Sequence, residues 1–317
     1  MIKAFEETKD FLILGHEEPD GDCVGSQMAL TLFLRRMGKN VEAINKGPFK
    51  KPEIKKYESS FHATIEPLQK SSKPLVVILD CSTPDRLGES ISSKISGLKT
   101  MVIDHHATGS EFGDIRYVDS KAVSTTLLIY RIMLALEEKP DRMEAEFLLL
   151  GLCTDTGFFR HLEGGNGEAL RLAADLSDVG CSLKSVHAHL NGGKLLENQK
   201  LMGLVLSRTE TYWDNKVLVS WEAQDDRSRL GAENRESDSI YQTLQGVVGN
   251  EVVILLRAES EGKTSVGLRS RNLVDVAQLA KDFGGGGHIR ASGFMAEIPM
   301  LALKKQLLKK LEVHFIN

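Results

Sequence analysis

The feature that most constrains this chain is a histidine and two aspartates placed between a predicted strand and a predicted helix. Residues 11–14 form a short apolar run that predicts a buried strand, and residues 26–37 predict the helix. His16, Asp20 and Asp22 lie between them. In open α/β sheets, ligands bind beyond the carboxyl ends of the strands, and imidazole with carboxylate suits a divalent metal such as manganese. The alternative is a polar loop with a helix-capping aspartate.

Groups of the same kind end three further segments. Residues 75–79 lead into Asp80, residues 100–103 lead into Asp104, His105 and His106, and a predicted helix over residues 143–151 leads to Asp155. Strands that alternate with helices predict βαβ units. The predicted fold class is therefore α/β, with a parallel sheet in the N-terminal part of the chain.

The strand ends of a parallel sheet share one edge, so these acids and imidazoles are expected to converge. Like charges packed together repel unless cations neutralise them. Two divalent metals with one bridging carboxylate are the simplest answer. Taken singly, these residues could also have a purely structural role, because Asp80 could cap a helix and His106 could be a core histidine.

The charge and the apolar runs of the sequence indicate where the protein is located and which partners it can bind. The net charge of −4 argues against a broad basic surface for long duplex nucleic acid. The N-terminal segment does not read as a signal peptide and no apolar run has membrane-spanning length, so we expect a cytoplasmic enzyme without membrane contact.

The four cysteines are widely spaced, with no Cys-x-x-Cys pair, which is typical of a reduced intracellular protein. Three of them, Cys23, Cys81 and Cys153, lie within two residues of the acids named above. They are either small buried residues beside the site or ligands of a thiolate zinc site.

The second half of the chain has a different pattern. We predict a metal-binding catalytic domain over residues 1–190, a linker helix over 191–209 and a smaller α/β domain over 210–317. The strand candidates are residues 216–221, 251–258 and 264–269, and residues 274–283 predict a helix. A glycine run at residues 284–287, a strand at 294–298 and a helix at 301–315 follow.

Together these motifs resemble the DHH phosphoesterase family. The order His-x-x-x-Asp-x-Asp, Asp, Asp-His-His and Asp matches its metal motifs, and Gly-Gly-Gly-Gly-His after Gly-Leu-Arg-Ser resembles the DHH-associated substrate-binding domain. The resemblance covers nearly the whole chain. Its compact length is similar to the branch of oligoribonucleases (nanoRNases) that also act as 3′-phosphoadenosine-5′-phosphate (PAP) phosphatases.

The resemblance implies two divalent metal ions, with manganese favoured. The residues that it implies for one metal are His16, Asp20 and Asp80, and for the other Asp22, Asp80, His105 and Asp155, with Asp80 bridging. Asp104 would orient a ligand imidazole, and His106 would face the substrate phosphate and act as an acid.

In the second domain the resemblance implies a substrate site. Arg269 and His288 would hold phosphate or base, with Arg290, Ser292, Gly286 and Gly287 beside them. The implied substrates are short single-stranded RNA or dinucleotides and PAP, and a homodimer is possible. The alternatives are a phosphodiesterase for linear or cyclic dinucleotides and a nucleotide-binding module that has lost catalysis. A Rossmann oxidoreductase is excluded because no Gly-x-Gly-x-x-Gly follows the first strand.

Overall fold

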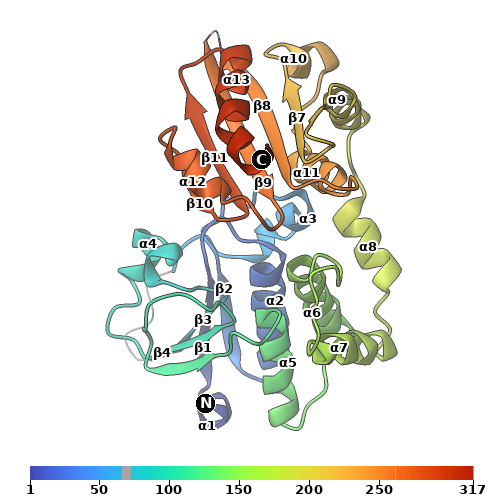
Figure 1. Cartoon of the computed structure of the whole chain (residues 1–317). Helices are drawn as coiled ribbons and strands as arrows, with labels where there is room; N and C mark the ends of the chain where they lie inside the picture. The colour runs from blue at the N-terminus through green and yellow to red at the C-terminus, as the bar shows by residue number, and fades with distance from the viewer. Residues whose placement is uncertain (66–72, 261, 317) are drawn as a thin grey trace. The chain divides into compact units, whose positions relative to one another are not determined.

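The computed structural model describes residues 1–65, 73–260 and 262–316. The chain divides into two compact units, Met1–Gly192 and Gly193–Asn317, each with its own sheet (Figure 1). The metal motifs of the sequence lie in the first unit, and the glycine run lies in the second. Each unit is therefore described by itself.

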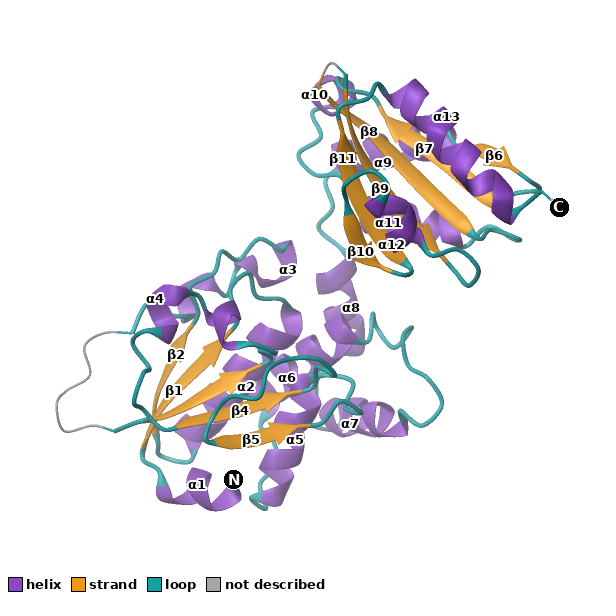
Figure 2. Cartoon of the chain, turned by 60° about the vertical axis from the view of Figure 1, so that its left-hand side comes forward, coloured by secondary structure: helices purple, strands orange, loops and turns teal. Residues whose placement is uncertain are grey.

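The first unit is built on five parallel strands in the order β2-β1-β3-β4-β5 (Figure 2). They are β1 (Asp10–Gly15), β2 (Asn40–Ile44), β3 (Leu75–Leu79), β4 (Thr100–Asp104) and β5 (Ile115–Val118). The three central strands are buried almost throughout, as expected for parallel strands covered on both faces. The predicted α/β fold with a parallel sheet is confirmed.

Alternate side chains of these strands form two cores. Phe11, Ile13 and Val77 face the long helices and Phe5 of the N-terminal helix, whereas Leu12 and Val76 pack on the other side with Leu87 and Ile91 of two short helices. The long helices are α2 (Gly21–Arg36), α5 (Thr125–Ala135), α6 (Arg142–Asp155), α7 (Gly167–Asp178) and α8 (Leu183–Asn191). The shorter ones are α1 (Ile2–Glu7), α3 (Pro52–Lys55), η1 (Glu58–Ser60), η2 (Pro84–Leu87) and α4 (Glu89–Ser92).

Two local features differ from the prediction. Helix α2 begins at Gly21 rather than at residue 26, because the Asp20 carboxylate accepts hydrogen bonds from the backbone N–H groups of Asp22 and Cys23. Strand β5 was not predicted, since its short sequence, Ile-Arg-Tyr-Val, is only half-buried at the edge of the sheet. The early helix start places Asp22 in a first helical turn instead of a loop.

The second unit holds a six-stranded mixed sheet in the order β10-β11-β9-β8-β7-β6. Its strands are β6 (Glu210–Tyr212), β7 (Val217–Glu222), β8 (Val252–Ser260), β9 (Lys263–Ser270), β10 (Gly286–His288) and β11 (Ala291–Ala296). Its helices are α9 (Leu196–Ser207), α10 (Asp226–Leu230), α11 (Ser237–Gln245), α12 (Val276–Lys281), α13 (Met300–Leu311) and η3 (Glu312–His314).

The two faces of this sheet carry different helices. Ile254, Val266 and Leu268 pack with α12 and α13, whereas Val253 and Leu255 pack with α9 and α11. Two element boundaries differ from those predicted from the sequence. The glycine run ends in the edge strand β10, and the strand expected to start at residue 294 starts at Ala291, because the two pair as a tight hairpin.

A membrane span is not found in the described part of the chain. Among those residues, no helix combines the length and the apolar character needed to cross a bilayer.

Candidate metal centre

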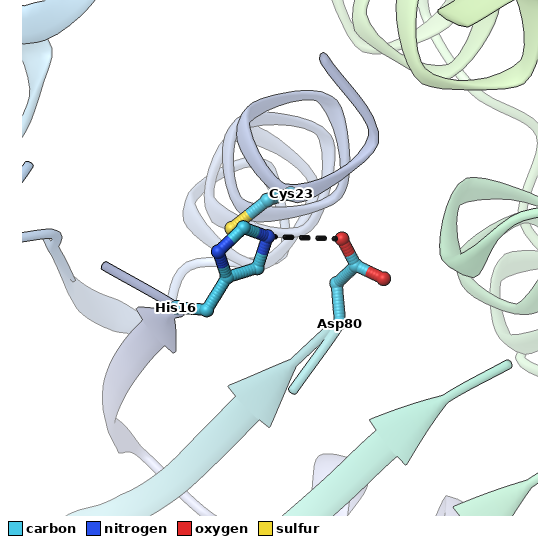
Figure 3. A group of neighbouring side chains, drawn as sticks. All are labelled: His16, Cys23 and Asp80. Carbon is cyan, nitrogen blue, oxygen red and sulfur yellow. Dashed lines mark ion pairs between the residues drawn. The ribbon is translucent and has the colours of Figure 1, made fainter. Parts of the chain in front are cut away.

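The carboxyl edge of the first sheet brings the predicted residues together around Asp80. Strand β1 ends next to His16 and strand β3 ends next to Asp80, so that the two side chains face each other (Figure 3). The distance from His16 Nε2 to Asp80 Oδ2 is 3.6 Å, and His105 Nε2 lies 3.6 Å from Asp80 Oδ1. Each oxygen of Asp80 thus faces a different imidazole, as a bridging carboxylate requires.

Two helices complete the group around His105. Its Nε2 atom lies 3.0 Å from Asp155 Oδ2 at the end of α6 and 3.9 Å from Asp22 Oδ2 in the first turn of α2. The donor atoms of Asp22, His105 and Asp155 all lie within 4.8 Å of one another. The four ligands implied for the second metal therefore meet in one place.

Both imidazoles are fixed in the orientation that a metal needs. His16 Nδ1 lies 2.7 Å from the carbonyl oxygen of Glu17, and His105 Nδ1 lies 3.3 Å from that of Ala122. A carbonyl only accepts, so Nδ1 carries the proton in each ring. The Nε2 atom of each ring then points towards the carboxylates, which is the usual arrangement behind a metal-binding histidine.

The start of helix α5 holds the acids in place, and sequence reasoning missed it. The backbone N–H groups of Thr125 and Thr126 donate to the two oxygens of Asp22 at 2.6 and 3.0 Å. The Thr125 hydroxyl donates to Asp80 Oδ1 at 3.1 Å. A run of three hydroxyl residues beginning at Ser124, just before an apolar helix, was the signal available in the sequence.

Asp104 binds the loop that carries the two histidines. Its Oδ1 atom accepts from the backbone N–H of His105 at 2.8 Å and faces His106 Nδ1 at 2.7 Å. The hydrogen bond from Asp104 raises the pKa of His106. His106 is thus oriented by Asp104, while its Nδ1 stays 3.7 Å from Asp80 Oδ1.

The shifted pKa values of this cluster indicate that its buried carboxylates would be stabilised by a cation. Burial, with the charges of Asp155 and Asp80, raises the pKa of Asp22 well above its usual value, and burial also raises that of Asp155. Burial opposes the charge on His105, but the hydrogen bond with Asp155 and the nearby carboxylates outweigh it and raise its pKa to about 10. A proton on His105 therefore partly neutralises the metal-free site, and a divalent cation would replace it.

Asp20 and Cys23 lie differently from the other residues near Asp80. One Asp20 oxygen caps α2, and the other lies 3.8 Å from Lys51 Nζ, so among the described residues Asp20 belongs to none of the donor groups that surround Asp80. The sulfur of Cys23 is instead within 4.8 Å of donor atoms of His16 and Asp80 (Figure 3). Nitrogen and oxygen donors dominate the centre, which fits manganese, magnesium or another divalent metal of this type.

In the second unit, two predicted residues lie in one row across three strands. Ala291 of β11 pairs with Arg269 of β9 on one side and with His288 of β10 on the other. Residues directly opposite in neighbouring strands present their side chains on the same face. Arg269 and His288 are therefore on one face, and Gly286 pairs with Gly293 in the next row of that face.

An aromatic ring fixes the direction of Arg269. Its guanidinium carbon lies 4.2 Å from the centre of the Tyr241 ring, in the range of a cation–π contact. The Tyr241 hydroxyl reaches over Gly267, where a Cβ atom would come within 1.8 Å of it. Gly267 is thus required for Tyr241 to lie flat beneath Arg269.

Three other predicted residues lie elsewhere. Ser292 is buried and its hydroxyl donates to the carbonyl of Val276 at 2.6 Å, on the α12 face of the sheet. Gly287 pairs with Ser292 and shares that face. Arg290, in the turn between β10 and β11, donates to the carbonyls of Asn272 and Val274. The structure therefore does not bring these three to the face of Arg269.

The comparisons with known proteins follow this division of the chain. Residues 10–152 match the model of the DHH family N-terminal domain, and residues 214–313 match that of the DHHA1 domain. The bifunctional oligoribonuclease and PAP phosphatase NrnA of Thermus thermophilus is 31% identical over 293 residues, which cover 92% of this chain and 85% of that protein. This chain belongs to the DHH family. The resemblance stated from the sequence motifs is confirmed.

Two other DHH-family similarities are more distant. The cyclic-di-AMP phosphodiesterase PdeA of Listeria monocytogenes is 22% identical over 338 residues, covering 98% of this chain but 48% of that protein. A crystal structure of an exopolyphosphatase-related protein from Bacteroides fragilis superposes with a TM-score of 0.79 at 23% identity, covering 99% of this chain and 96% of the other. The latter supports the fold.

Proposed function

We propose that this protein is a metal-dependent phosphoesterase that hydrolyses short oligoribonucleotides to nucleoside monophosphates and also dephosphorylates PAP. The observation that carries the proposal is the buried Asp80, with a different imidazole facing each of its oxygens. Similarity to NrnA of Thermus thermophilus over both domains supports the substrate class. All four cysteines are buried and free, which supports a cytoplasmic location.

Two divalent metals fit the donor groups of the first unit. We assign one to His16 and Asp80, with Asp20 as its predicted third ligand, and the other to Asp22, Asp80, His105 and Asp155. When bound, such metals activate water and neutralise phosphoryl oxygens. Manganese is the proposed metal, because the donors are nitrogen and oxygen atoms of intermediate hardness.

The chain's own groups supply orientation and a proton. His16 and His105 keep their Nε2 atoms towards the carboxylates because carbonyl oxygens hold their Nδ1 protons. His106 is partly exposed, and its hydrogen bond with Asp104 raises its pKa, which favours the protonated imidazole. We assign it the role of the acid that protonates the leaving oxygen.

The second unit supplies groups for substrate recognition. Arg269 offers a guanidinium that lies over the Tyr241 ring, and His288 shares its sheet face. A guanidinium binds phosphate through paired hydrogen bonds, and an exposed imidazole stacks on bases. We therefore assign phosphate and base binding to these two residues.

The second candidate function is hydrolysis of linear or cyclic dinucleotides. The similarity to the Listeria cyclic-di-AMP phosphodiesterase over 98% of this chain supports it. Both functions need the same metal centre, so they differ only in which substrate the second unit accepts.

Product analysis separates the two. Purified protein with added manganese is incubated with labelled RNAs of two to twenty nucleotides, PAP, and cyclic-di-AMP. We expect mononucleotides from the shortest RNAs and loss of the 3′-phosphorylated form of PAP. Faster turnover of cyclic-di-AMP would favour the second function, and no metal-dependent turnover of any substrate would refute both. Asp80→Asn protein is the inactive control.

A further inference from the structure

Arg86 lies against the metal centre, although no motif pointed to it. It belongs to the short helix η2, which follows strand β3 and Asp80. The backbone N–H of Glu17 donates to the Arg86 carbonyl at 2.7 Å, which ties this segment to the loop after β1. Its guanidinium Nη2 atom lies 3.1 Å from Nδ1 of His16. Arg86 is therefore held beside a metal-ligating imidazole.

With the ring proton of His16 on Nδ1, this close contact is not a hydrogen bond. His16 Nδ1 is also 2.7 Å from the carbonyl of Glu17, so that nitrogen carries the ring proton. Arginine has only donor groups, and two donors cannot satisfy each other. Within the described residues, Arg86 forms no ion pair with a carboxylate. Its half-buried guanidinium thus keeps N–H donors that lack an acceptor.

Four other arginines of this unit behave differently. Arg36, Arg116, Arg131 and Arg142 each pair with a glutamate or aspartate side chain. Unpaired guanidinium groups are costly where water is partly excluded, and they are common where a substrate supplies the acceptor. Arg86 differs from these four in having no carboxylate partner among the described residues, and its environment favours an anionic ligand.

The charge balance of the centre indicates the same ligand. Five aspartates converge there, namely Asp20, Asp22, Asp80, Asp104 and Asp155. Lys51 Nζ lies 3.8 Å from Asp20, so with two divalent cations the five carboxylates would be close to neutralised. The positive charge of Arg86 beside His16 would then favour an anionic phosphoryl group.

We propose that Arg86 is a phosphate-binding residue of the active site, which donates hydrogen bonds to a non-bridging oxygen of the phosphoryl group under attack. This rests on the proposed phosphoesterase function and names the residue in the first unit that recognises the group common to all its substrates. Arg269 and His288 would recognise the rest of the nucleotide. Loss of Arg86 should therefore weaken the binding of every substrate, including one without a base.

Inorganic phosphate and p-nitrophenyl phosphate are suitable probes, because neither carries a base. Calorimetric titration measures phosphate binding to protein loaded with two equivalents of manganese, and steady-state kinetics measures the KM of p-nitrophenyl phosphate. For Arg86→Ala we expect the dissociation constant of phosphate and the KM to rise about tenfold or more, as for a lost charged hydrogen bond. Arg86→Lys keeps the charge, so its dissociation constant and KM should fall between those of the wild type and of Arg86→Ala.

Arg142→Ala is the matched control. It removes the same charge from the same unit, but Arg142 is exposed and begins α6, about 20 Å along the helix from Asp155. Its phosphate affinity should equal that of the wild type. Arg86→Gln removes the charge but keeps a polar side chain, and it replaces Arg86→Ala if the alanine variant unfolds.

Two results would overturn the inference. Unchanged phosphate affinity in folded Arg86→Ala or Arg86→Gln would remove its basis. Loss of bound manganese with normal phosphate affinity at saturating metal would show that Arg86 only positions His16. The proposed function is tested separately. If wild-type protein binds phosphate through Arg86 but cleaves neither RNA nor PAP, the function fails while this assignment stands.

Discussion

At the residue scale, Asp80 is the side chain on which the centre depends. Its backbone adopts a left-handed φ of 55°, a conformation that is uncommon outside glycine, although aspartate tolerates it better than most residues. Its two oxygens face His16 and His105.

Replacing this carboxylate tests the bridging role. Asp80→Asn should lower turnover roughly a hundredfold or more, because one of the two amide positions cannot ligate a metal. The fold should persist, since the change removes a buried negative charge from a crowded site. Metal analysis with kinetics checks both statements. Normal turnover with two metals still bound would contradict the bridging assignment.

The protonation of His105 makes the metal-free protein sensitive to pH. Its pKa is raised from 6.5 to about 10 in the folded state, so it stabilises the fold fully below pH 6.5. That stabilisation is lost as pH rises towards 10. We expect the thermal midpoint of chelator-treated protein to fall over this interval, and the fall to be smaller in His105→Asn. Saturating manganese should remove most of the pH dependence, because metal replaces the proton. A flat profile without metal would contradict this.

The sequence predicted that these residues lie close together, for a physical reason. Asp80, His105 and Asp155 are of metal-ligating types and follow strand or helix patterns that end at one edge of a parallel sheet; their roles as ligands stay a prediction. Thr125 and Arg86 were not predicted. A threonine at a helix start is ordinarily a helix cap. An arginine can be identified as a ligand-binding residue only when its neighbours in space show that it lacks a carboxylate partner.

At the element scale, strand pairing decides which residues share a face. The β10-β11-β9 register puts Arg269 and His288 on one face and Ser292 on the other. The sequence suggested all three together, because alternation along one strand does not reveal the register between strands. Likewise, helix α2 starts earlier than predicted because the Asp20 cap depends on side-chain geometry.

The two faces should respond differently to mutation. Arg269→Ala and His288→Ala should lower kcat/KM for di- to tetranucleotides about tenfold or more, and should leave metal content unchanged. Ser292→Ala should instead cost about 1 kcal/mol of stability, because its hydroxyl bonds to Val276, with little effect on kcat/KM. Kinetics and denaturant unfolding of the three variants separate these effects. An equal kinetic loss in Ser292→Ala would refute the assignment by face.

At the scale of the whole molecule, the proposed chemistry and the proposed recognition are assigned to separate units. Every donor group assigned to a metal lies in Met1–Gly192, whereas Arg269 and His288 lie in Gly193–Asn317. Each unit has its own buried core, so each is expected to unfold as its own cooperative element. The change of pattern near residue 210 made two domains predictable. Which helices join which core was less predictable, because α9 packs with the second sheet although it reads as a linker.

This separation predicts a selective effect of metal on unfolding. Calorimetry of the full chain should show two transitions, and manganese should raise only that of the first unit. At free metal about a hundredfold above the dissociation constant, the gain is about 2.7 kcal/mol per site. Leu307→Ala, which opens the core of the second unit, identifies the other transition by lowering it. Asp80→Asn should lose most of the metal shift. If manganese raises both transitions equally in the wild type, the metals are not confined to the first unit and the assignment of ligands is wrong.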